Sequence, residues 1–105
     1  MSFILVDGVH IETDDDGFIM QSGDWIESFA IESAKNVGIG ELSEDHWQVI
    51  HYLRNYYQQF NIAPMVRMMC KETGFSLKRI YELFPAGPGK GACKLAGLPK
   101  PTGCV

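Results

Sequence analysis

Two cysteines near the end of the sequence are the residues whose types and spacing point to chemistry. Cys104 is the second-last of the 105 residues and follows Gly103, and ten residues separate it from Cys93. A thiol at the tip of a chain is open to reagents, and the glycines and prolines between the two cysteines allow the loop to close. Closing a loop of this length carries a chain-entropy term of about 3 kcal/mol. Two thiols that pair reversibly suggest a carrier, in which Cys104 is loaded with a sulfur-bound group that Cys93 then attacks.

Basic side chains accompany these thiols. Residues 49–105 carry eight basic and two acidic side chains, whereas residues 1–48 carry one basic and eleven acidic side chains. We therefore expect the basic half to bind an anion or to dock on a partner. The alternative is that the two halves attract each other within the fold. The candidates for this partner-binding or anion-binding role are Lys90, Lys94, Lys100 and Arg67.

Other catalytic or metal-binding patterns are weak. The cysteines lack the C-x2-C spacing of zinc sites, and the chain has no P-loop, dinucleotide fingerprint or Ser/His/Asp constellation. Cys70 shares a predicted helix face with Met69 and Thr73, which favours a buried structural thiol. We expect no cofactor or metal bound by this chain and no independent active site.

Composition predicts one soluble globular domain. The chain is 46% hydrophobic and 21% charged, and no apolar run is long enough to span a membrane. Its first ten residues lack the basic region of a secretory signal, and its odd number of cysteines argues against a secreted disulfide scaffold. We expect a cytoplasmic protein.

Mainly α-helical elements must position the two thiols. Alternating apolar residues predict a short hairpin over 3–11 with a turn at Asp7-Gly8. Helical spacing and capping residues predict helices over 24–37, 44–60, 64–73 and 77–84. The glycines and prolines that follow argue against a regular helix, apart from a possible single turn around 92–96. The predicted fold is a compact helical bundle with a small N-terminal β-hairpin, in which residues 1–85 form the body and residues 86–105 a mobile C-terminal arm.

The last two predicted helices have the spacing of a helix-turn-helix pair around the turn at 73–76. Lys78 and Arg79 open the second helix of this pair, where a recognition helix would contact DNA. The acidic net charge of −4 and the shortness of this helix count against duplex binding. A DNA-binding regulator is therefore a less favoured alternative.

Several segments resemble the DsrC/TusE family of sulfur carriers. Residues 83–105, LFPAGPGKGACKLAGLPKPTGCV, carry the most specific similarity, and EDHW at 44–47 and IAPMVR at 62–67 support it. The resemblance implies a C-terminal arm that enters the alpha and beta subunits of dissimilatory sulfite reductase. It also implies that Cys104 receives partly reduced sulfur and that Cys93 joins it in a trisulfide. Siroheme and iron–sulfur clusters would belong to the reductase, and a membrane oxidoreductase complex would reduce the trisulfide to release sulfide.

The resemblance leaves a second sulfur-transfer role open. TusE-type members of the family pass persulfide sulfur through sulfurtransferase relay proteins toward transfer-RNA thiolation and keep only the penultimate cysteine. The presence of Cys93 therefore favours the sulfite-reductase branch, and the short turn at 73–76 points the same way. The direction of sulfur flux stays open.

Overall fold

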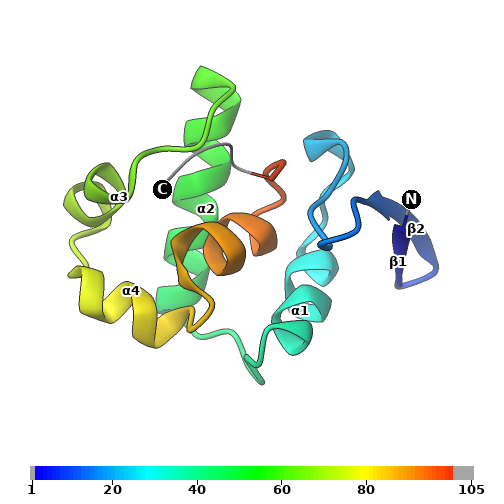
Figure 1. Ribbon diagram of the computed structural model, residues 1–105, viewed down its shortest axis with the longest axis horizontal. Coiled ribbons are helices and arrows are strands. Elements are labelled where there is room, and N and C mark those ends of the chain that lie inside the picture. The colour runs from blue at the N-terminus through cyan, green and yellow to red at the C-terminus, as the bar shows by residue number, and fades with distance from the viewer. Residues whose placement is uncertain (1, 101–105) are drawn as a thin grey trace.

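Four α-helices build the body of the chain, and a small hairpin lies at one side of it (Figure 1). The computed structural model describes residues 2–100. The fold is mainly α with a small β component, as the sequence predicts. In chain order the elements are β1 (Ser2–Val6), β2 (Val9–Thr13), the 3-10 turn η1 (Ser22–Asp24), α1 (Glu27–Asn36), α2 (Glu44–Phe60), α3 (Val66–Thr73), α4 (Leu77–Leu83) and the π-helix η2 (Pro88–Cys93).

Local capping residues decide where the central helix begins and how it joins α4. The Ser43 hydroxyl accepts the backbone N–H of His46, and His46 Nδ1 accepts the backbone N–H of Ser43. This reciprocal pair satisfies donors that the first turn of α2 would otherwise leave unpaired. The other ring nitrogen of His46 lies 2.7 Å from the carbonyl oxygen of Leu83, so the same residue ties α2 to the end of α4.

The hairpin pairs β1 with β2 in antiparallel fashion around the Asp7-Gly8 turn predicted from the sequence. Val6 pairs with Val9, and the connecting residues Asp7 and Gly8 both have positive φ, as a type I′ turn requires. Its inner side chains, among them Val6 and Ile11, form a small cluster with Phe29 of α1. The hairpin therefore covers one side of α1.

The predicted helix-turn-helix-like pair is present as α3 and α4. Gly74, with φ of +80°, ends α3, and the Ser76 hydroxyl accepts the N–H of Arg79 to begin α4. The first predicted helix is shorter than expected, because the chain makes the η1 turn before α1 begins at Glu27. No helix among residues 2–100 has the length and apolar character needed to cross a membrane.

The segment over 86–98 differs most from the prediction. The sequence predicts a mobile arm without a regular helix over 86–105, and for residues 86–98 that prediction is wrong. Pro88–Cys93 is a π-helix, and the main hydrophobic core includes the following fully buried side chains: Ala92, Cys93, Leu95, Ala96 and Leu98. Figure 1 shows the segment in orange in front of α2.

Small side chains explain why a glycine-rich and proline-rich segment lies in the core. A Cβ added at Gly91 would lie 3.1 Å from Cβ of Phe84, so the backbone approaches its neighbours more closely than a larger residue permits. The predicted turn around 92–96 is confirmed, because helical hydrogen bonding continues past Cys93, with the N–H of Ala96 donating to the carbonyl of Ala92. Residues 101–105, which include Cys104, lie outside the described residues.

Candidate functional site

Cys93 is a buried thiol at the end of η2. Its side chain has no exposed surface and lies in the main hydrophobic core. Burial raises its pKa to about 12, because the thiolate would lose its hydration in apolar surroundings. Cys93 is therefore protonated near neutral pH, and it becomes a nucleophile only when its surroundings change.

Two side chains from distant parts of the sequence hold the turn that follows Cys93. Trp25 Nε1–H donates to the carbonyl oxygen of Leu95 over 2.8 Å, and Arg54 Nη1–H donates to the carbonyl oxygen of Ala96 over 2.9 Å. The Arg54 guanidinium also lies 4.2 Å from the centre of the Trp25 ring. We call this pair the Trp25–Arg54 clamp.

Gly97 lets the clamp close on the backbone. Its φ is +73°, and an added Cβ would lie 2.3 Å from Trp25 Cδ1 and 2.9 Å from Arg54 Nη1. The N–H of Gly97 donates to the carbonyl of Lys94, and the N–H of Leu98 donates to the carbonyl of Cys93. This pair of hydrogen bonds is a Schellman motif, which ends the helical turn at Gly97.

The last described residues of the chain lie beside the loop between α2 and α3. Leu98, Pro99 and Lys100 line a cavity of about 140 Å³. The other lining residues are Tyr57, Asn61, Ile62 and Ala63. The last five residues of the sequence, which contain Cys104, thus start from this loop.

The three lysines predicted to bind a partner or an anion act instead on the acidic turn at Asp14–Gly17 through their charge. The Lys100 ammonium forms an ion pair and a hydrogen bond with Asp16, which lowers the pKa of Asp16, and Lys94 and Lys90 lower it further by their charge. Lys94 also lies over the Phe18 ring, 5.1 Å from its centre. Arg67, the fourth candidate, lies exposed on α3.

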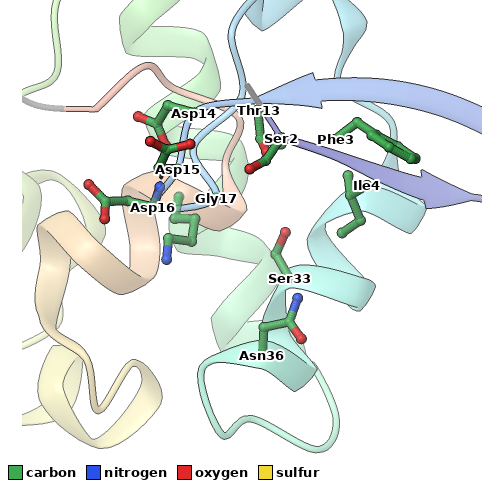
Figure 2. A pocket seen from close by; sticks show the side chains of 11 residues that line it. Ser2, Phe3, Ile4, Thr13, Asp14, Asp15, Asp16, Gly17, Ser33 and Asn36 are labelled. Carbon is green, nitrogen blue, oxygen red and sulfur yellow. Dashed lines mark hydrogen bonds between the residues drawn. The ribbon is translucent and has the colours of Figure 1, made fainter.

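The acidic turn borders a cavity of about 380 Å³ beside the hairpin and α1 (Figure 2). Three carboxylates and one lysine line it, so an anion would face net negative charge there. The lining residues are Ser2, Phe3, Ile4, Thr13, Asp14, Asp15, Asp16, Gly17, Ser33, Asn36 and Lys94.

Ion pairs between the oppositely charged halves support the intramolecular alternative considered for the charge asymmetry. Besides Asp16 with Lys100, Asp45 of α2 binds Arg79 of α4 over 2.9 Å. Arg79 also pairs with Glu82, so this basic residue in the first turn of α4 is bound by two carboxylates. Cys70 is half-buried against the main core, which is less burial than its helix face predicts.

Neither the role of Arg54 nor the contact of Trp25 with the C-terminal turn is predicted from the sequence. The one sequence feature that points to Arg54 is its position after Leu53, at the edge of an otherwise apolar helix stripe. A basic residue at such an edge can reach a backbone carbonyl that packs on the helix, but the sequence does not say which one. The structure joins Trp25 to a carbonyl 70 residues further along the chain.

Comparison with known proteins gives consistent results. A family model described as "DsrC like protein" matches residues 5–105. The chain is 50% identical over 105 residues to the "sulfite reductase, dissimilatory-type subunit gamma" of Nitratidesulfovibrio vulgaris strain Hildenborough, covering all of both chains. It is 43% identical to the sulfurtransferase TusE of Shigella dysenteriae serotype 1, covering 97% of this chain and 99% of that one. A chain in the crystal structure of dissimilatory sulfite reductase I has a TM-score of 0.91 and 52% identity, with 99% of this chain and all of that chain covered.

Proposed function

The chain belongs to the DsrC-like family, and from this premise we propose that it carries sulfur for a dissimilatory sulfite reductase. Cys104 receives the sulfur atom that the reductase has partly reduced, and Cys93 joins it so that the sulfur bridges both thiols as a trisulfide. Two observations support the proposal. A relative named as a sulfite reductase subunit aligns over the full length of this chain, and this chain contains both Cys93 and Cys104.

The observation that carries the proposal is the contrast between the two thiols. Cys93 is buried and protonated at rest, with a pKa of about 12, whereas Cys104 is four residues beyond Lys100 in the sequence, outside the described residues. The resting protein therefore withholds Cys93, and we assign loading to Cys104. Bridging requires the clamped turn to open, so that Cys93 loses its proton and reaches the loaded sulfur.

The proposed chemistry balances. One sulfite ion, two thiols, two electrons from the reductase and four protons give the trisulfide and three water molecules. The trisulfide then takes up four electrons and four protons, which restore both thiols and release hydrogen sulfide. Siroheme and iron–sulfur clusters are assigned to the reductase and the second reduction to a membrane oxidoreductase complex. Among residues 2–100, no group of three or more metal-ligating side chains comes together.

A turnover experiment with cysteine variants tests this function. The reduced chain is incubated with sulfite and a reductase that is supplied with limiting electrons, and peptide mass spectrometry then locates the added sulfur. We expect one sulfur atom bridging Cys93 and Cys104 in the parent chain and in the Cys70→Ala control. Cys104→Ala should take up none, and Cys93→Ala should hold sulfur only on Cys104. Sulfur uptake by the Cys104→Ala variant would overturn the proposal.

A persulfide relay toward transfer-RNA thiolation is the second candidate, because the TusE relative also aligns over nearly the whole chain. That alignment runs over 110 positions for 105 residues and so contains gaps, whereas the alignment with the gamma subunit runs over 105. A one-thiol relay needs only Cys104. Full persulfide transfer by Cys93→Ala to a relay sulfurtransferase, together with no uptake of sulfur from the reductase by the parent chain, would favour this candidate.

A further inference from the structure

The end of α2 and the loop after it carry exposed apolar side chains, with the charged residues Arg67, Glu72 and Lys100 only at the edges of this surface. Residues 55–66 contain no charged side chain, although 21% of the whole chain is charged. Within this run Phe60 is 57% exposed, Ile62 is 62% exposed and Met65 is 72% exposed. We call these three residues, together with the partly exposed Met68 of α3, the charge-free face.

Its composition is that of an interface centre. Protein interfaces are enriched in aromatic residues and methionine and depleted of charge at their centres, and methionine adapts its shape to a partner. The face continues along α2, because the rings of Tyr56 and Phe60 lie 4.6 Å apart and those of Tyr52 and Tyr56 lie 6.1 Å apart. An open groove of about 330 Å³ lies between α2 and α3 at this place, and its lining residues are Tyr52, Asn55, Tyr56, Gln59, Phe60, Met68 and one charged residue, Glu72.

The sequence distance from Lys100 to Cys104 relates this face to the protein that receives the Cys104 thiol. Ile62 lines the cavity from which Lys100 leads into the last five residues. Cys104 is four residues beyond Lys100, and four extended residues span at most about 14 Å. A protein that takes the Cys104 thiol into its own site must therefore have its opening within that distance of Lys100, and its surface around the opening must meet the side chains near Ile62.

We propose that the charge-free face is the docking surface for the sulfite reductase, which meets it with an apolar rim around the opening that receives Cys104. The proposal rests on the function proposed above and adds the part of this chain that the partner contacts. The charged residues of the arm are not the main contact in this account, since Lys100 is paired with Asp16.

The hairpin supplies a matched control surface. Leu5 is 63% exposed, almost the same as Ile62, and it too is an aliphatic side chain. β1 lies on the side of the molecule away from α3 (Figure 1). A lysine at either position removes the same kind of surface, but only the change at Ile62 affects the proposed contact.

The experiment measures binding of the reduced full-length chain to purified reductase alpha and beta subunits by biolayer interferometry. We expect Ile62→Lys and Met65→Lys each to weaken binding tenfold or more and Leu5→Lys to stay within twofold of the parent. Circular dichroism checks the fold, and Ile62→Ser and Met65→Ser replace any lysine variant that does not fold. Labelling of Cys104 by a small disulfide reagent should be unchanged in all variants.

The possible outcomes separate this surface from the function on which it rests. If the parent binds and the variants at Ile62 and Met65 bind within twofold of it, the docking surface is rejected and the carrier function stands. If Leu5→Lys weakens binding as much as they do, the assignment to this face is also rejected. If the parent chain itself does not bind the reductase, both proposals are rejected together.

Discussion

The N-terminal hairpin and the segment over 88–98 are held in the fold in different ways. The hairpin is regular, but one side of it is open, with large apolar side chains such as Phe3 and Leu5 exposed. The C-terminal segment is a short π-helix and one further turn, but it is buried in the main core, and the side chains of Trp25 and Arg54 bind its carbonyl groups. The candidate reactive thiol Cys93 therefore lies in buried surroundings held by contacts from distant parts of the chain.

Replacing the glycine inside the Trp25–Arg54 clamp should cause the largest loss in the free energy of unfolding. In Gly97→Ala the new methyl group would lie 2.3 Å from Trp25 Cδ1 at a φ of +73°. Overlap and backbone strain together should lower the free energy of unfolding by about 4 kcal/mol. Urea unfolding measures it. The matched control is Gly8→Ala in the hairpin turn, where φ is +78° and nothing lies within 4 Å. That control should lose only about 1 kcal/mol, and equal losses would mean that the clamp is not closed on Gly97.

Removing a buried side chain after the clamp comes second. Leu98 is fully buried, and Leu98→Ala should lower the free energy of unfolding by about 3 kcal/mol through lost burial and a new cavity. Leu5→Ala on the open side of the hairpin should change it by less than about 0.5 kcal/mol. Both are measured by thermal and urea unfolding. A Leu98→Ala variant as stable as Leu5→Ala would show that 88–98 is not part of the core in solution.

Loss of one clamp hydrogen bond should have a smaller effect that is local to Cys93. Trp25→Phe keeps an aromatic ring but leaves the buried carbonyl of Leu95 without its donor, at a cost of about 2 kcal/mol. Because the cost falls on the turn next to Cys93, alkylation of Cys93 in the folded chain should become at least tenfold faster. Trp47→Phe, at a partly buried residue packed against the main core and outside the clamp, serves as the control. Unchanged Cys93 labelling in Trp25→Phe would separate the clamp from the thiol.

High pH should reveal the buried thiol through stability. The folded pKa of Cys93 is raised to about 12 from an ordinary value of 9.0, so above pH 9 the unfolded chain releases this proton while the folded chain keeps it. Stability from this group is complete below pH 9 and is lost as the pH rises toward 12. At pH 10 the loss is about 1 kcal/mol. The pH dependence of urea unfolding should therefore be steeper for the parent chain than for Cys93→Ala, and equal slopes would contradict a buried Cys93.

Local signals in the sequence predicted much of the fold because their physical causes are local. Ser43 and Ser76 cap helices, Gly74 ends one, and Asp7-Gly8 makes the hairpin turn through contacts within a few residues. The same rules failed for 88–98, since they treat glycine and proline as breakers of regular helices. There, small residues permit close packing, and that benefit depends on contacts far away in the sequence.

The sequence predicts which residues form the candidate site, but it does not predict that Cys93 is buried. The spacing of Cys93 and Cys104 points to paired thiol chemistry, and the similarity to a sulfite reductase gamma subunit and to a sulfurtransferase agrees with it. The burial of Cys93 depends on tertiary contacts, including a hydrogen bond from Arg54 to a carbonyl 42 residues away. No periodicity or motif encodes such a contact, so the sequence placed Cys93 on a mobile arm, whereas the structure has it buried in the core.

Differential alkylation of the reduced chain, read by peptide mass spectrometry, compares the reactivity of the two thiols. We propose that Cys104 is the thiol loaded with sulfur and that Cys93 is withheld until its turn opens. At pH 8 we expect Cys104 to be labelled at least a hundredfold faster than Cys93, and Cys93 to react readily once the chain is unfolded in urea. Equal labelling rates of Cys93 and Cys104 in the folded chain would show that Cys93 is not withheld.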